Sequence, residues 1–264
     1  MGEELTYKDE AAAGYDRAFG HVTKHFVSYL LHAARIEPGM RVLDIATGTG
    51  FAAEAALEIV GPAGHVTAAD QSPAMVEKAR ERLRHSKSAS VAVEDGQALS
   101  FPAESFDAVV CSLGLMFFPD ALRGLTEFRR VLQTGGRAAV SVNTVPERSY
   151  NNFINLAIAR HIPSLAAAAA RVFSLGGDLK LRSLFAAANF RDVEITTESH
   201  RFVLPSFDAY FEPFERGGGS PGQAFVSLSV EARKAVRDEV QRALRDAGGP
   251  IEVEVEYRFA SGRR

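Results

Sequence analysis

The 264-residue sequence contains a single cysteine, Cys111, so it can form neither an internal disulfide nor a thiolate metal site. Cys111 closes an apolar run that begins at Ala108, and we expect it to pack as a small core residue of a strand. The chain also lacks a basic excess, because 30 lysines and arginines face 33 acidic residues. The phosphate backbone of nucleic acids binds to basic protein surfaces, so we expect no nucleic-acid partner.

The sequence shows no targeting or membrane segment. Its first residues, with Glu3 and Glu4, lack a basic segment followed by an apolar core. No apolar run approaches the roughly 20 residues that a membrane helix needs. We therefore expect a soluble cytoplasmic protein with no membrane partner. With 46% apolar residues, the chain can bury a full core as one domain over residues 1–264.

The most informative stretch that is present runs from Val42 to Gly50, where an apolar strand is followed by a glycine turn that opens a helix. Glycine lets the backbone turn sharply and approach a ligand closely. We therefore assign Gly48 and Gly50 to a nucleotide-type cofactor. The same turn fits the looser GxGxxA form of a dinucleotide fingerprint, so the glycines alone do not choose between cofactors.

Acidic residues at three strand ends favour one cofactor. Asp44 ends the first strand, and its carboxylate would repel a pyrophosphate but attract the amino group of a methionine moiety, directly or through water. S-adenosylmethionine is therefore favoured over NAD. Asp70, after the second strand, can accept both ribose hydroxyls, and Asp95, after the third, can accept from an adenine amino group. Helix capping next to Ser72 and Pro73 is the alternative role for Asp70.

Strands and helices alternate along the chain, which predicts an α/β fold with a parallel sheet and helices on both faces. Apolar spacing predicts a first helix within residues 16–35. Gly135 and Gly136 are expected to end the helix before the fifth strand, and residues 165–170 are expected to form a buried helix. The further expected helices cover 52–60, 73–83 and 120–132, and the further strands cover 107–112, 137–142, 192–196 and 251–257.

These motifs resemble the class I S-adenosylmethionine-dependent methyltransferases, in particular the branch with the ubiquinone and menaquinone methylases. The likeness extends over residues 15–145 and rests on residues 42–50, 69–75, 94–102, 105–112 and 130–140. It implies a Rossmann-like, doubly wound, seven-stranded and mostly parallel sheet with an antiparallel last strand. It also implies cofactor contacts at Asp44, Ala46, Thr47, Gly48, Gly50, Asp70, Gln71, Met75, Asp95, Gly96, Gln97, Ser112 and Leu113.

Two segments outside the alternation are expected to set acceptor specificity. Residues 1–35 resemble the N-terminal helical lid of the family and bring Tyr7 as one of their polar groups. Residues 202–249 are rich in phenylalanine and are expected to form a helical cap between the last two strands. Their rings either build the core of this cap or line an apolar acceptor pocket.

A general base is not assigned by the sequence. Tyr15, His21 and His25 are the candidates, since imidazoles titrate near neutral pH. His21 and His25 also have metal-ligand spacing on a helix, but no third ligand is near, so we expect no metal site. Helix packing is the alternative role for both histidines. The loop after Leu115 lacks the histidine that relatives often carry, and the chain lacks the Asn-Pro-Pro-aromatic tetrapeptide of many N-methyltransferases.

The resulting hypothesis is a methyltransferase that acts on a small, apolar or aromatic acceptor, with O- or C-methylation favoured. Asn143, after the fifth strand, is a further candidate for acceptor contact. The alternatives are an NAD-dependent oxidoreductase, which Gly48 and Asp70 permit, and a noncatalytic S-adenosylmethionine-binding protein.

Overall fold

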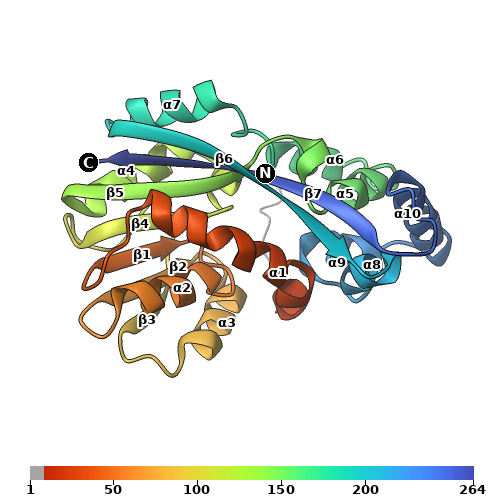
Figure 1. Cartoon of the computed structure of the whole chain (residues 1–264), viewed down its shortest axis with the longest axis horizontal. Coiled ribbons are helices and arrows are strands. Elements are labelled where there is room, and N and C mark those ends of the chain that lie inside the picture. Colours follow the sequence, from red (N-terminus) through yellow and green to blue (C-terminus); the bar gives the residue numbers. More distant parts are fainter. Residues whose placement is uncertain (1–8) are drawn as a thin grey trace.

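The computed structural model describes residues 9–264, and its centre is a single seven-stranded sheet (Figure 1). The strands follow the spatial order β3-β2-β1-β4-β5-β7-β6. Strand β7 pairs antiparallel with both β5 and β6, while the pairs among β1 to β5 are parallel. The strands are β1 (Arg41–Ile45), β2 (His65–Asp70), β3 (Ala89–Val93), β4 (Phe106–Ser112), β5 (Leu132–Asn143), β6 (Arg191–Leu204) and β7 (Ile251–Arg263).

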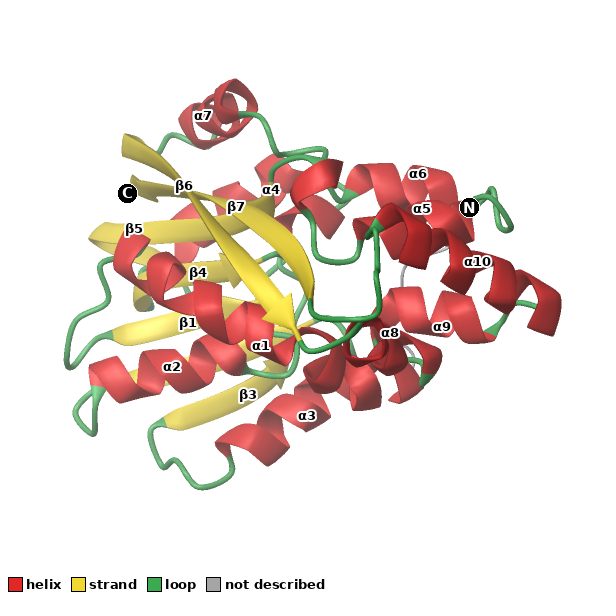
Figure 2. Cartoon of the chain, turned by 45° about the vertical axis from the view of Figure 1, so that its right-hand side comes forward, coloured by secondary structure: helices red, strands yellow, loops and turns green. Residues whose placement is uncertain are grey.

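Helices cover both faces of this sheet (Figure 2). Helices α1, α2 and α3 pack together on one face, and α4 and α7 pack on the other. The helices are α1 (Asp9–Ala33), α2 (Phe51–Val60), α3 (Pro73–Leu83), α4 (Ala121–Val131), α5 (Asn152–Ala159), α6 (Leu165–Arg171), α7 (Asp178–Ala187), α8 (Phe207–Glu215), α9 (Gly219–Val226) and α10 (Val230–Ala243), with short 3-10 turns η1 (Leu115–Phe117) and η2 (Pro146–Arg148). The predicted doubly wound fold is confirmed.

Alternating residues of the central strands feed two separate cores. On β1, Val42 belongs to the core beneath α1 and α2, whereas Leu43 belongs to the core beneath α4. The strand order reverses between β1 and β4, because β1 continues to β2 on one side and β4 to β5 on the other. In open α/β sheets the ligand crevice lies at the carboxyl ends of the strands at this switch point. The fold therefore places the end of β1, with Asp44, at the crevice.

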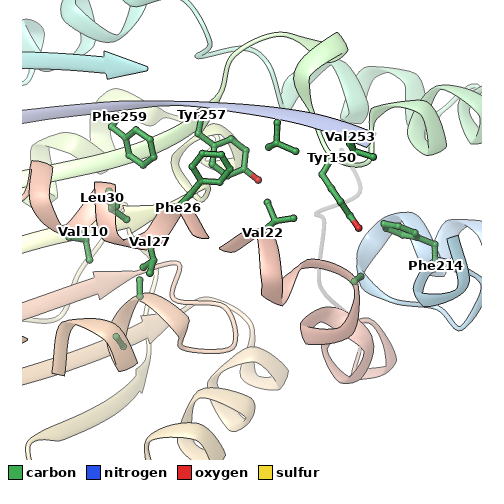
Figure 3. Packing of buried hydrophobic residues seen from close by; sticks show 14 of the residues in the cluster. Val22, Phe26, Val27, Leu30, Val110, Tyr150, Phe214, Val253, Tyr257 and Phe259 are labelled. Carbon is green, nitrogen blue, oxygen red and sulfur yellow. The ribbon is translucent and has the colours of Figure 1, made fainter. Parts of the chain in front are cut away.

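The core beneath α1 continues into a helical lobe built from α8, α9 and α10, together with α5 (Figure 1). Figure 3 shows this continuity, from Val110 and Phe259 on the sheet, past Phe26 of α1, to Phe214 of α8. Tyr210 of α8 donates a hydrogen bond from its hydroxyl to the backbone oxygen of Tyr150, at 2.7 Å. The lobe and the sheet thus share one apolar interior.

Several boundaries differ from the expectations. Strand β6 continues to Leu204, so Phe202 lies in a strand rather than in the helical segment. Helix α4 ends at Val131, and the Gly135-Gly136 pair lies inside β5, where it accompanies a register shift against β4. Helix α6 forms as expected but is mostly exposed, because it packs against α5 at the rim of the lobe. Residues 1–8 of the expected lid, with Tyr7, lie outside the described residues.

Candidate cofactor site

The loop after β1 turns through three left-handed backbone positions. Ala46, Gly48 and Gly50 have φ values of 55°, 56° and 91°. A Cβ atom built on Gly48 meets no atom within 4 Å, so this glycine borders open space at the crevice. A Cβ atom on Gly50 lies 3.3 Å from the Cα of Ala79 in α3. Gly48 therefore leaves room for a ligand, whereas Gly50 lets the loop approach α3.

Asp44 lies beneath this loop and is fully buried. Its Oδ2 accepts a hydrogen bond from the hydroxyl of Thr47 at 2.5 Å. Its Oδ1 has no hydrogen-bond partner among residues 9–264. Burial raises the pKa of Asp44 to about 7, against the opposing effects of the Thr47 hydroxyl and of the backbone N–H of Ala53. A buried carboxylate with a free oxygen is costly in isolation and suits a ligand that brings a charged donor.

Asp70 connects the glycine loop to the start of α3. Its Oδ2 accepts from the backbone N–H of Gly48 at 2.9 Å, and its Oδ1 accepts from that of Ser72 at 2.9 Å. Ser72 in turn caps α3 by accepting from the N–H of Met75. Burial raises the pKa of Asp70. The carboxylate thus shapes the crevice, and each oxygen keeps a lone pair for a further donor.

The predicted adenine segment lies beside the loop that follows β4. Asp95 is exposed and its Oδ1 accepts from the N–H of Gln97 at 2.9 Å. The amide oxygen of Gln97 accepts from the N–H of Asp120 at the start of α4, at 2.8 Å. A Cβ atom on Gly96 would lie 2.4 Å from the ring of Phe118. Gly96 therefore permits close packing of two loops, and the Asp95 carboxylate stays open to solvent.

The loop after β4 approaches the glycine loop from the opposite side. Leu113 has a left-handed φ of 53°, and its N–H donates to both the backbone oxygen and the hydroxyl of Ser141, each at 3.1 Å. A Cβ atom on Gly114 would lie 2.4 Å from the Cβ of Ala46. Ser112 is half-buried at the end of β4. Two strained loops thus meet at the switch point, where strain often marks a functional site.

Sequence reasoning missed an ion-pair network that fixes α1 to the glycine loop. The hydroxyl of Thr49 donates to Asp16 of α1 at 2.6 Å. Arg82 of α3 donates from Nε to the backbone oxygen of Thr49 at 2.7 Å, pairs with Asp16 and with Glu54, and lies 3.8 Å from the ring centroid of Phe51. Asp16 and Arg82 lie 33 residues to either side of Thr49 and belong to no motif. No local signal could have identified them.

The remaining expected site residues lie at three places. Thr47 is buried beneath the loop, Met75 is buried in the first turn of α3, and Gln71 is exposed after β2. Tyr15 packs against the ring of Phe19 within α1, with centroids 5.1 Å apart. The histidine candidates lie further along the same helix.

His21 and His25 contact strand β6. The ring of His21 lies 5.1 Å from that of Tyr150 and 5.4 Å from that of Phe202. The ring of His25 lies 3.7 Å from that of His200. Burial lowers the pKa of both histidines, and the neighbouring His200 lowers that of His25 further. Both imidazoles are therefore favoured in the neutral form, packed against β6.

Comparison with known proteins agrees with this geometry. Residues 42–136 match the methyltransferase domain family. An arsenite methyltransferase from Halobacterium salinarum is 31% identical over 78% of this chain and 49% of its own length. A ubiquinone/menaquinone biosynthesis C-methyltransferase from Bordetella avium is 39% identical over 43% of this chain and 44% of its own length. The chain thus spans about half the length of these relatives.

A solved structure extends the likeness in fold to nearly the whole chain. Phosphoethanolamine N-methyltransferase 2 from Haemonchus contortus, in complex with phosphomonomethylethanolamine and S-adenosylhomocysteine, superposes with a TM-score of 0.63 at 18% identity. The superposition covers 98% of this chain and 58% of that protein. The glycine loop with its strand-end acids, the seven-stranded sheet and the domain match lead to one assignment. Residues 42–136 form a methyltransferase domain of the class I type, whose cofactor is S-adenosylmethionine.

Proposed function

We propose that this protein transfers a methyl group from S-adenosylmethionine to a small acceptor. The observation that carries the proposal is the fully buried carboxylate of Asp44, whose Oδ1 lacks a partner within the described residues. The ammonium group of a methionine moiety would satisfy this oxygen, directly or through one water. A pyrophosphate would be repelled by it, which disfavours the NAD-dependent alternative.

The other expected contacts fit the rest of the cofactor. The open direction at Gly48 leaves backbone space beside the methionine part, near Ala46 and Thr47. Asp70 would accept from the ribose hydroxyls with the lone pairs that its two backbone hydrogen bonds leave free. We assign Gln71, Met75, Asp95, Gly96 and Gln97 to the adenosine end, and Gly50, Ser112 and Leu113 to the methionine side of the crevice.

The chemistry requires positioning more than covalent help. S-adenosylmethionine supplies a methyl group on a sulfonium, which is an excellent leaving group. The residues of this chain would hold the acceptor in line with that group and exclude water, which is worth up to about 7–11 kcal/mol. Tyr15, His21 and His25 remain the candidates for a base. Burial lowers the pKa of His21, which favours the neutral imidazole that a base requires.

We infer that the acceptor is apolar or aromatic and that oxygen or carbon is methylated. Aromatic rings pack together between α1, β7 and the helical lobe, among them those of Phe26, Tyr150, Phe202 and Phe214. A quinone-type acceptor, as named for the Bordetella relative, suits these aromatic surroundings. Arsenite is a soft, thiol-seeking acceptor, and the single Cys111 is fully buried with a raised pKa, so arsenite is disfavoured.

We further propose that α1 acts as a lid and that the helices between β6 and β7 act as a cap over the acceptor. The ion pair of Asp16 with Arg82 at the glycine loop supports the first role. The shared core of Tyr210, Phe211 and Phe214 with α1 supports the second.

Over the described residues, none of the helices has the length and apolar character needed to span a bilayer. We propose a cytoplasmic location, and the net charge of -3 disfavours nucleic acid as the acceptor.

Isothermal titration with S-adenosylmethionine, S-adenosylhomocysteine and NAD tests the proposal. We expect binding of the first two and no response to NAD. Tight binding of NAD alone would replace this proposal with the oxidoreductase alternative. Mass spectrometry of cell extracts incubated with the protein and isotope-labelled methyl donor then identifies the methylated product. Cofactor binding without any labelled product would favour the noncatalytic alternative.

A further inference from the structure

A row of polar side chains crosses the sheet at the carboxyl ends of its central parallel strands. Strands β1, β4, β5 and β7 are consecutive neighbours in the sheet. Ser112 is in register with Ser141, and Asn143 is in register with Tyr257. Register partners point to the same face, and Asp44 points there too, because its partner on β4 lies two residues before Ser112. The polar row is therefore Asp44, Ser112, Ser141, Asn143 and Tyr257.

The members of the polar row differ in how their polar groups are satisfied. Ser141 accepts from the N–H of Leu113 and lies 3.5 Å from the hydroxyl of Ser112. Asn143 and Tyr257 are 8% and 6% exposed, yet neither side chain forms a hydrogen bond within residues 9–264. Among the described residues, Oδ1 of Asp44 is the one side-chain polar atom that is fully buried without a partner, so the amide of Asn143 and the hydroxyl of Tyr257 keep some accessible surface. Two adjacent polar groups with unused hydrogen bonds, on one face of an otherwise buried region, are available to a partner from outside the chain.

The surroundings of this pair define the partner. The ring of Tyr257 packs 4.5 Å from that of Phe26, and Figure 3 shows it extending from β7 toward α1, near Val22. Tyr150 approaches the same region from the loop before α5. An apolar ring system would fill such surroundings, while a charged group would remain unpaired there.

We propose that Asn143 and Tyr257 together bind a neutral oxygen, a hydroxyl or a carbonyl, on a flat aromatic acceptor. This inference rests on the proposed methyltransferase function and specifies its acceptor. The amide of Asn143 can both donate and accept, and the hydroxyl of Tyr257 can donate to the acceptor's oxygen. The polar row leads from this pair to Asp44, so the acceptor's oxygen would lie on the same face as the methionine end of the cofactor.

The protonation state of the pair agrees with a neutral ligand. Burial raises the pKa of Tyr257, and the nearby Tyr150 raises it further. The hydroxyl therefore stays protonated at neutral pH and remains a donor. An asparagine amide carries no charge. Neither group could compensate a carboxylate or a phosphate on the acceptor.

Binding of 1-naphthol to the protein loaded with S-adenosylhomocysteine tests the inference. We expect the wild type to bind 1-naphthol more tightly than naphthalene, which lacks the oxygen, or 1-naphthoate, which is charged. Tyr257→Phe and Asn143→Leu should each weaken 1-naphthol binding about three- to tenfold, as expected for one lost hydrogen bond. Their binding of naphthalene and of S-adenosylhomocysteine should stay unchanged. Tyr29→Phe, which removes an exposed hydroxyl from α1, is the matched control.

Thermal unfolding of the unliganded variants separates a binding role from a structural one. Tyr257→Phe should unfold at a temperature no lower than the wild type, because it loses no internal hydrogen bond. A lower unfolding temperature with unchanged 1-naphthol binding would overturn the inference. Absent 1-naphthol binding, or equal binding by wild type and both variants, would also overturn it while the cofactor proposal stands. Failure to bind S-adenosylhomocysteine at all would instead overturn both proposals.

Discussion

At the scale of single residues, the end of β1 combines two energetically unfavourable features. Asp44 is a fully buried carboxylate with one unpartnered oxygen within the described chain, and Ala46 has a left-handed φ of 55°. Each costs free energy in the unliganded protein. Such costs are typical of residues whose conformation is selected for ligand binding rather than for stability. Both therefore provide measurable tests.

Replacing Ala46 with glycine should stabilise the protein. Glycine adopts a left-handed φ without the steric cost of about 1–2 kcal/mol that a Cβ imposes. Its greater entropy in the unfolded chain offsets about 0.4–1 kcal/mol of this gain, so the net effect should be a stabilisation of roughly 0.5–1 kcal/mol. Urea unfolding measures the change. Ala186→Gly, on the exposed side of α7, is the control and should destabilise by about 0.5–1 kcal/mol. Destabilisation by Ala46→Gly would show that the backbone of Ala46 is not strained.

Replacing Asp44 with asparagine should change how stability depends on pH. The pKa of Asp44 is raised from 3.8 to about 7 in the folded protein, so its contribution to stability is present below pH 4 and is lost as pH rises through 7. Asparagine does not ionise. Within that window the stability of Asp44→Asn relative to the wild type should rise by about 1.4 kcal/mol per pH unit.

Urea unfolding of both proteins from pH 4 to pH 8 measures this difference. The variant should also lose most of its affinity for S-adenosylhomocysteine, because an amide cannot neutralise the ammonium group. A difference in stability that is independent of pH would show that the carboxylate is not perturbed by burial.

At the scale of elements, the crevice is held by contacts between segments that are distant in sequence. Asp70 connects the glycine loop to α3, Ser141 of β5 fixes Leu113 after β4, and Asp16 ties α1 to Thr49. The sequence identified the strands, the glycine loop and the strand-end acids, because each has a local pattern. It did not reveal these cross-links or helices α5 and α7, because long-range pairing and packing leave no periodic signal.

Removing the Asp16 carboxylate should loosen α1 from the cofactor site. Asp16→Ala deletes the hydrogen bond with Thr49 and the ion pair with Arg82, so S-adenosylhomocysteine should bind about two- to fivefold more weakly. Hydrogen exchange should rise in the first half of α1 and stay unchanged in the sheet. Glu77→Ala, which breaks an exposed ion pair with Arg80 on α3, is the control. Equal exchange in both variants would argue against a lid held by this network.

At the scale of the whole molecule, a doubly wound sheet and a helical lobe share one core. The alternation of strands and helices along the sequence predicted the fold class. The alternation of charged and apolar residues in β6 and β7 predicted the antiparallel pair. The predicted start of the cap, residue 202, lies inside β6 in the structure. Phe202 continues the alternation of the strand residues before it and packs against His21. Which rings face an acceptor depends on how α1, β7 and α8 converge, and only the tertiary structure shows this.

A crystal structure of the complex with S-adenosylhomocysteine tests the central claim most directly. We expect the ammonium nitrogen of the ligand to bind Oδ1 of Asp44, directly or through one ordered water. The ribose hydroxyls should bind Asp70, and the space beside Asn143 and Tyr257 should be left free for the acceptor. A ligand bound away from the end of β1, or an Asp44 carboxylate that makes no contact with it, would contradict this account.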